Sequence, residues 1–234
     1  MTRDASEALI LVPGLLCDAL VWQHAIATFA PTRRVVVPML DTLDSIPAMA
    51  TQLLADAPAR FALAGHSLGG RISLEVYRQA PQRVSRLALL DTGVHPCAPG
   101  EPARRQELVS LALTRGMRAL ARAWLPPMVH PARRADPAII GPLEAMVEHR
   151  TPDTFRNQVT ALLNRPDAAP VLAAISCPSL VLCGREDEWS PLAQHEVIAS
   201  GIRCARLAVI DDAGHFAPFE QPAAVTDQLR TWLE

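Results

Sequence analysis

The chain has 234 residues, of which 50% are hydrophobic and 20% are charged, and its formal net charge is −2. This length and composition allow one α/β domain with a sizeable core and argue against a disordered chain. No basic run is longer than Arg-Arg, which excludes an electrostatic site for nucleic acid or for an anionic membrane.

Six short apolar runs predict the strands of a parallel sheet. They are nearly continuous in Val, Leu, Ile and Ala, as expected for strands that are buried on both faces. The predicted strands are Ala8–Val12, Arg34–Val37, Phe61–Ala64, Leu87–Leu90, Ser179–Cys183 and Arg206–Ile210. Helical patterns alternate with these strands, so the sequence predicts an α/β fold.

The first apolar stretch, Ala8–Leu16, is interpreted as a strand and not as a signal peptide. Asp4 and Glu7 precede it and Pro13-Gly14 interrupts it, whereas a signal peptide has a basic start and an unbroken apolar segment. No apolar run approaches the roughly 20 residues that span a bilayer. The five cysteines are scattered without a Cys-x-x-Cys pair, which is typical of reduced thiols in a cytoplasmic protein.

Proline and glycine mark the ends of the helices that lie between these strands. A helical pattern over Leu68–Ala80 ends at Pro81. Ser190-Pro191 is interpreted as an N-cap followed by a proline in the first turn, with Gly201 as the stop. Pro222 opens a last helix that has one apolar face.

Residues 95–177 differ from the rest of the chain. They contain no convincing strand, they are rich in Pro, Arg and Met, and they carry apolar residues at helical spacing in Met117–Trp124, Ile139–Val147 and Phe155–Leu163. A segment of this length is too long for an ordinary loop. We therefore expect residues 1–94 and 178–234 to form the core and residues 95–177 to form a helical cap inserted into it.

A serine flanked by glycines lies directly after the predicted strand Phe61–Ala64. The segment Gly65-His66-Ser67-Leu68-Gly69 fits the pattern Gly-x-Ser-x-Gly, and a helix begins at once. Such a sharp turn holds the serine in a strained conformation and exposes its hydroxyl at a helix N-terminus. The pattern alone is weak evidence, because glycine-rich turns also bind nucleotides, but the spacings of those loops are absent here.

A serine hydroxyl needs a base that removes its proton and a third group that orients the base. In an open parallel sheet, both must come from loops at the carboxyl ends of strands. The loop after the last predicted strand carries His215, and the loop after the strand before it carries Glu186-Asp187-Glu188. His66 adjoins the serine but is expected to point elsewhere. The sequence thus predicts Ser67 as the nucleophile and His215 as the base.

Cleavage of an acyl group also needs donors for the negative charge that develops on the carbonyl oxygen. We assign one donor to the backbone N–H of Leu68 and the other to the loop after Ala8–Val12, where Leu15 is our choice. Cys17 in the same loop is a conceivable second nucleophile, which we do not favour because no base is assigned to it.

Together these motifs resemble those of the α/β-hydrolase superfamily, in the branch that has a helical cap between the sixth and seventh strands of the family's sheet. The resemblance covers nearly the whole chain. The matching motifs are Gly-His-Ser-Leu-Gly-Gly at 65–70, Leu-Ala-Leu-Leu-Asp at 87–91, Gly-x-x-Asp-x-x-x-Pro at 184–191, Ala-Gly-His-Phe at 213–216 and Glu220-x-Pro222. The resemblance places the triad acid on Asp187, while Asp91 occupies a position that some relatives use instead.

Two departures from the family pattern bear on these expectations. Too few residues precede Ala8–Val12 for the family's N-terminal hairpin. We therefore expect an α/β-hydrolase fold with a mostly parallel sheet of about six strands, flanked by helices, in the order 4-3-5-6-7-8 of the family's numbering. Many relatives have His-Gly in the oxyanion loop, where this chain has Pro13-Gly14. Since backbone supplies the donor, we expect the chemistry to survive with a different anchoring of the loop.

We expect a serine hydrolase that cleaves a small to medium carboxylic ester through an acyl-enzyme intermediate, without a cofactor or a metal. A lactonase of the 3-oxoadipate enol-lactone type and a thioesterase are alternatives. A non-catalytic small-molecule receptor on the same fold is an alternative of another class. The expected partner is a small ester-like molecule, not a nucleic acid or a membrane.

The apolar residues expected near the site predict its pocket. The predicted pocket residues are Leu16, Trp124, Met128, Trp189 and Phe216. Arg71 follows the serine by one helical turn. We interpret it as facing solvent or bracing the cap, with a substrate carboxylate as the less favoured partner.

Overall fold

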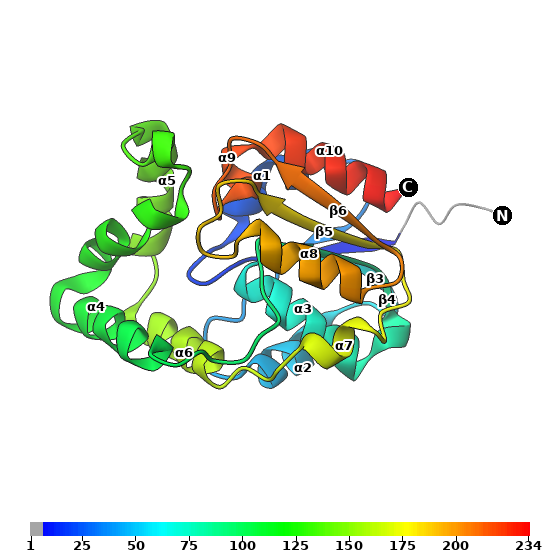
Figure 1. Cartoon of the computed structure of the whole chain (residues 1–234), viewed down its shortest axis with the longest axis horizontal. Coiled ribbons are helices and arrows are strands. Elements are labelled where there is room, and N and C mark those ends of the chain that lie inside the picture. Colours follow the sequence, from blue (N-terminus) through cyan, green and yellow to red (C-terminus); the bar gives the residue numbers. More distant parts are fainter. Residues whose placement is uncertain (1–6) are drawn as a thin grey trace.

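The structure, a computed structural model, describes residues 7–234, so the first six residues of the expected core lie outside the described residues. Within this range, six strands form one parallel sheet in the order β2-β1-β3-β4-β5-β6 (Figure 1). The strands are β1 (Ala8–Val12), β2 (Val35–Val36), β3 (Phe61–His66), β4 (Val84–Leu90), β5 (Ser179–Gly184) and β6 (Ala205–Ile210). A parallel sheet of six strands is what the sequence predicts.

Helices cover both faces of the sheet, and this explains why β1, β3 and β5 are buried along their whole length. One face carries α1 (Gln23–Phe29) and α10 (Pro222–Leu233) (Figure 1). The other face carries α2 (Ile46–Asp56), α3 (Leu68–Gln79) and α8 (Leu192–Gly201). The two edge strands, β2 and β6, are only partly buried.

Three helices lie away from the sheet: α4 (Glu101–Trp124), α5 (Pro137–Glu148) and α6 (Pro152–Leu163) (Figure 1). α4 packs against both α5 and α6. Inside α4, Gly116 has φ 80° and ψ 171°, a combination that essentially only glycine adopts. The helix therefore consists of two segments joined by a kink.

The remaining elements are short. They are α7 (Ala169–Leu172), α9 (Ala217–Glu220) and four 3-10 turns at Ala19–Trp22, Pro81–Arg83, Pro126–Met128 and Pro131–Arg133. α7 packs against α8, where a Cβ on Gly201 would lie 2.9 Å from Leu172 Cδ1. The helical segment expected between the two core segments is therefore present, and its definition as a separate cap over residues 95–177 stays a prediction.

The start of α8 differs from the sequence prediction. The helix begins at Leu192 with Pro191 as its N-cap residue, and Ser190 lies outside it. The Ser190 N–H instead donates to Asp187 Oδ1 at 2.8 Å, so this turn is organised around the aspartate. No helix among residues 7–234 combines the length and the apolar character that crossing a bilayer requires.

Candidate active site

Ser67 occupies the turn between β3 and α3 with φ 54° and ψ −116°. A positive φ strains a residue that has a Cβ, so neighbouring contacts must hold it. A Cβ on Gly65 would lie 2.2 Å from the Gly69 carbonyl oxygen, and one on Gly69 would lie 2.2 Å from the Val12 carbonyl oxygen. Thr92 Oγ1 donates to the Ser67 carbonyl at 2.7 Å. The strained turn thus depends on two glycines and one threonine.

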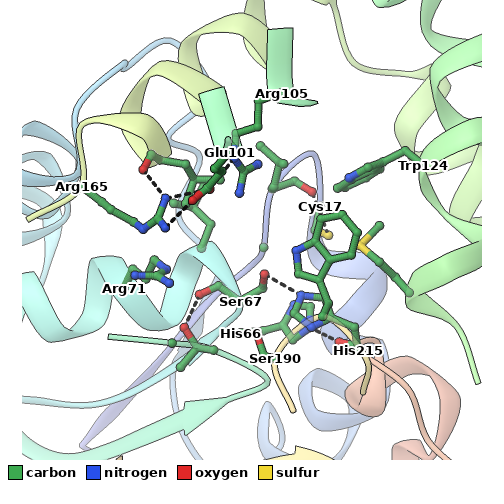
Figure 2. A pocket seen from close by; sticks show the side chains of 18 of the residues that line it. Cys17, His66, Ser67, Arg71, Glu101, Arg105, Trp124, Arg165, Ser190 and His215 are labelled. Carbon is green, nitrogen blue, oxygen red and sulfur yellow. Dashed lines mark hydrogen bonds and ion pairs between the residues drawn. The ribbon is translucent and has the colours of Figure 1, made fainter. Parts of the chain in front are cut away.

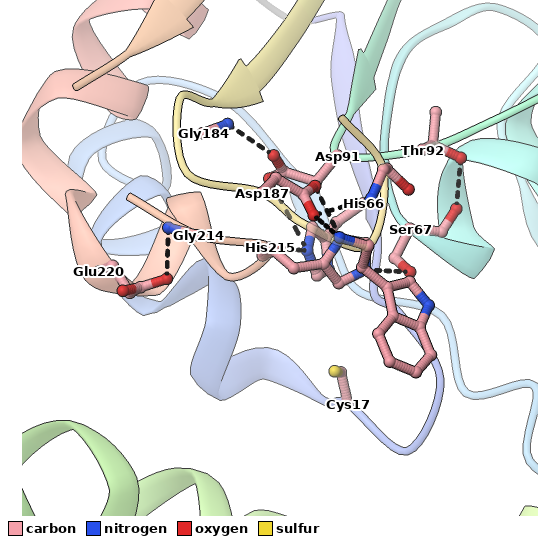
Figure 3. Close-up of polar contacts among 12 residues, drawn as sticks. Cys17, His66, Ser67, Asp91, Thr92, Gly184, Asp187, Gly214, His215 and Glu220 are labelled. Atoms are coloured by element: carbon pink, nitrogen blue, oxygen red, sulfur yellow. Dashed lines mark hydrogen bonds and ion pairs between the residues drawn. The ribbon is translucent and has the colours of Figure 1, made fainter. Parts of the chain in front are cut away.

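The Ser67 hydroxyl begins a chain of hydrogen bonds (Figure 3). It lies 2.8 Å from His215 Nε2, and His215 Nδ1 lies 2.8 Å from Asp187 Oδ2. Burial alone would raise the pKa of Asp187, but the charge and hydrogen bond of His215, with two backbone N–H groups, outweigh it and hold this pKa below its usual range. An ionised Asp187 keeps the proton on Nδ1, which leaves Nε2 free to accept the hydroxyl proton.

The loop that carries His215 is fixed by two groups whose roles the sequence does not reveal. His66 Nε2 donates to the His215 carbonyl at 2.7 Å, so His66 points away from the hydroxyl, as expected. Burial and then the charge of His215 lower the pKa of His66 to about 3, so His66 is neutral. The buried Glu220 carboxylate accepts the N–H groups of Gly214 and His130, each at 2.9 Å.

Asp91, the alternative triad acid, does not contact His215. Its Oδ1 accepts the Gly184 N–H at 2.8 Å, and its Oδ2 lies 3.9 Å from His66 Nε2. Burial, followed by the negative charge of Asp187, raises the pKa of Asp91 well above its usual range. The geometry therefore favours Asp187 as the partner of the histidine.

The loop after β1 passes directly beside the serine. A Cβ on Gly14 would lie 3.2 Å from Ser67 Cβ. The Leu16 N–H donates to Gln158 Oε1 on α6 at 2.8 Å, so it is committed to that contact. Leu15 therefore remains the loop's candidate for the oxyanion donor.

The second candidate donor, the Leu68 N–H, belongs to the first residue of α3. The assignment of Leu15 and Leu68 to the oxyanion hole stays a prediction. Cys17 in the same loop donates from Sγ to the Leu15 carbonyl at 3.3 Å, and burial raises the pKa of its thiol to about 12. A thiol that stays protonated is a poor nucleophile, which agrees with our preference for serine.

A cavity of about 570 Å³ opens over the serine (Figure 2). Four of the predicted pocket residues line it, namely Trp124, Met128, Trp189 and Phe216. The fifth predicted pocket residue, Leu16, is fully buried and does not line this cavity. The backbone turns at Leu16, where φ is 59°, and its neighbours Leu15 and Cys17 line the wall instead.

The polar part of the cavity wall contains four arginines and three glutamates, namely Arg71, Arg104, Arg105, Arg165, Glu101, Glu107 and Glu188. Figure 2 shows Arg71, Arg105 and Arg165 around Glu101, a cluster that the sequence does not predict. Both oxygens of Glu101 accept from Arg165, at 2.8 and 2.7 Å, and Arg105 Nε donates to the same carboxylate at 2.7 Å. Burial would raise the pKa of Glu101, but the two guanidinium groups lower it far below its usual range. Arg71 also lines this wall and donates to the His95 carbonyl at 2.9 Å.

Comparisons with known proteins show the family of this chain. A sequence model described as the alpha/beta hydrolase family matches residues 9–228. A pimeloyl-[acyl-carrier protein] methyl ester esterase of Nitrosomonas europaea is 28% identical over 189 residues, which cover 77% of this chain and 72% of that protein. A thermophilic esterase from Thermogutta terrifontis, whose structure has malate bound, is similar with a TM-score of 0.89 and 28% identity, over 97% of this chain and 89% of that one.

A third relative cleaves a different kind of substrate. A 2-hydroxy-6-oxononadienedioate/2-hydroxy-6-oxononatrienedioate hydrolase of Paraburkholderia xenovorans is 26% identical over 177 residues, which cover 69% of this chain. The aligned part is 57% of that protein's length, so the match spans less than two thirds of it.

Proposed function

The chain belongs to the alpha/beta hydrolase family, and we propose that it is a serine hydrolase that cleaves small to medium carboxylic esters. One observation carries the proposal, namely the continuous hydrogen-bonded chain Ser67–His215–Asp187 beneath the cavity. Two of its relatives are esterases at 28% identity, which supports ester cleavage as the reaction class.

The proposed reaction begins when Ser67 Oγ attacks the ester carbonyl carbon and His215 Nε2 takes the hydroxyl proton. Asp187 stabilises the imidazolium, and the N–H groups of Leu15 and Leu68 donate to the oxyanion. Collapse of the tetrahedral intermediate breaks the ester C–O bond, and His215 gives its proton to the departing alkoxide. Water, activated by the same histidine, then releases the acid from the acylated serine.

The cavity has the size and lining for such a substrate. Its volume of about 570 Å³ falls within the roughly 300–1,000 Å³ of small-molecule sites. Trp124, Met128 and Phe216 supply apolar surface in the lining, and Figure 2 shows Trp124 on the same side of Ser67 as His215. An acyl or alkyl group is expected to pack there.

Labelling with a fluorophosphonate probe tests the nucleophile. We expect the protein to be labelled and Ser67→Ala to lose both the label and the hydrolysis of p-nitrophenyl butyrate. The matched control is Ser200→Ala, because Ser200 is exposed and its hydroxyl donates to the Val197 carbonyl of its own helix. If the Ser67→Ala variant were labelled and active like the parent, the proposal would be wrong.

Substrate classes separate the remaining alternatives. The same assay is run on a panel of p-nitrophenyl esters, lactones and acyl thioesters. We expect the highest kcat/KM on an ester. A higher value on a lactone or a thioester would replace the esterase by that alternative, and an unreactive Ser67 would favour a small-molecule receptor.

A further inference from the structure

Arg71 shares the cavity with the candidate nucleophile. It lies on α3 four residues after Ser67, and residues at this spacing lie on the same face of a helix, about 6 Å apart along its axis. Figure 2 shows its guanidinium on the side of the serine away from His215. A group bound to Arg71 would therefore lie a short distance from the ester carbonyl.

The charge of Arg71 is not balanced by the protein. Glu101 is already shared between Arg165 and Arg105. Among residues 7–234, Arg71 forms no ion pair, and its hydrogen bond goes to the neutral His95 carbonyl, which also accepts from Arg165 at 3.0 Å. Three guanidinium groups thus surround the carboxylate of Glu101. The whole lining has four arginines and three glutamates, and one of these glutamates, Glu188, pairs with Arg134 outside the lining, so positive charge remains in excess in the cavity wall.

This excess has a cost, because Arg71 is partly buried and a charge without a counter-ion loses part of its hydration there. Burial and then the repulsion of Arg165 lower the pKa of Arg71 to about 9, so the guanidinium is still charged at neutral pH. Gly93 leaves room for the Arg71 guanidinium, because a Cβ at this position would lie 2.9 Å from Arg71 Nη2. A brace for the His95 loop alone would not need a charge in this position.

On the basis of the function proposed above, we propose that Arg71 binds a carboxylate of the substrate, so that the enzyme prefers half-esters of small dicarboxylic acids. The guanidinium fork suits a carboxylate because it donates two parallel hydrogen bonds. The ester group then lies at Ser67 and the free carboxylate at Arg71, with a short aliphatic chain between them. The anion would balance charge that the protein leaves unbalanced.

The test compares two esters that differ only in the distal group, monoethyl glutarate and ethyl pentanoate. Acid release is followed by pH-stat for the parent and for Arg71→Met, Arg71→Lys and Arg206→Met. The last variant is the control, because Arg206 lies at the start of β6 and contacts Gln228. Monoesters of succinate and adipate then define the preferred chain length.

We expect the parent to prefer monoethyl glutarate, and Arg71→Met to lower kcat/KM on it roughly ten- to hundredfold through KM, with little change on ethyl pentanoate. Arg71→Lys should recover part of the preference, and Arg206→Met should keep it. Equal losses on both esters would mean that Arg71 only braces the fold, and this result would overturn the proposal. So would a parent that cleaves ethyl pentanoate without preferring the half-ester.

The proposed esterase function has a separate readout. If neither ester is cleaved and Ser67 is not labelled, the proposed hydrolase function fails. In that case, glutarate binding by the parent and by Arg71→Met is measured by calorimetry. Tighter binding by the parent would support the carboxylate site, and equal binding would refute it.

Discussion

The orientation of Asp187 predicts the effect of the isosteric variant Asp187→Asn. Oδ1 of this residue accepts the N–H groups of Trp189 and Ser190, each at 2.8 Å. These two donors require an oxygen, so the new amide must turn its NH2 group toward His215 Nδ1. The imidazole must then accept at Nδ1 and carry its proton on Nε2, facing the Ser67 hydroxyl. In this tautomer the histidine cannot accept the serine proton.

The expected loss is about four powers of ten in kcat, the order that a wrong tautomer causes in a triad. This corresponds to about 5.5 kcal/mol in the activation free energy. The assay is steady-state hydrolysis of p-nitrophenyl butyrate, with a thermal unfolding scan to show that the variant is folded. The stability should change much less than the rate, because the amide replaces the carboxylate without a change of shape.

Asp91→Asn is the matched comparison. Burial and the negative charge of Asp187 raise the pKa of Asp91, so its carboxyl is expected to be neutral and an amide reproduces it closely. We expect this variant to lose less than about tenfold in kcat. An Asp187→Asn enzyme that keeps a tenth of the parental kcat, or an Asp91→Asn enzyme that loses more than Asp187→Asn, would refute the assignment of the triad acid.

Three further predictions concern stability. Glu101→Gln leaves the buried Arg165 without its counter-charge. A urea titration should show that this variant lowers the free energy of unfolding by about 3–5 kcal/mol. The control Glu148→Gln, which removes the exposed pair with Arg118, should leave the free energy of unfolding unchanged. The pKa of Glu101 is lower in the folded protein than in the unfolded chain. The ionised carboxylate therefore stabilises the fold fully above the unfolded pKa of about 4.3, and this stabilisation is lost as the pH falls below it. The parent should lose more stability than Glu101→Gln between about pH 5 and pH 3. Gly116→Ala should cost about 1–3 kcal/mol through its backbone conformation, although a Cβ there would contact nothing within 4 Å. Ser110→Ala, at an exposed position of the same helix, should instead change the stability by less than about 0.5 kcal/mol. Equal effects of the two alanines in thermal unfolding would contradict this reasoning.

The sheet is predictable from sequence because its signal is local. Each buried strand is a continuous apolar run, and prolines and glycines mark the turns. The main error in a strand boundary has a physical cause, because β4 begins at Val84 and not at Leu87. The polar pair Ser85 and Arg86 interrupts the apolar run, yet Arg86 is accommodated by donating to the Trp232 carbonyl at 2.8 Å.

The site is predictable only where a motif links residue type to position. Ser67 and His215 follow strand ends, and the resemblance selects Asp187, so the structure brings together three residues that the sequence proposes. Glu101 and Arg165 lie 64 positions apart in segments without a strand pattern, and no spacing in the sequence indicates that they meet.

The kink at Gly116 has a consequence for how the substrate range of this protein can diverge. The first segment of α4 carries Glu101 and Arg105, and the second ends at Trp124; all three residues line the cavity. The kink at Gly116 therefore sets the distance between the polar and the apolar residues that α4 contributes to the cavity. A change in the kink angle would alter at once the size and the charge of the substrates that the cavity accepts. The residues proposed to cleave the ester bond would stay in place, because they lie on loops at the ends of the strands.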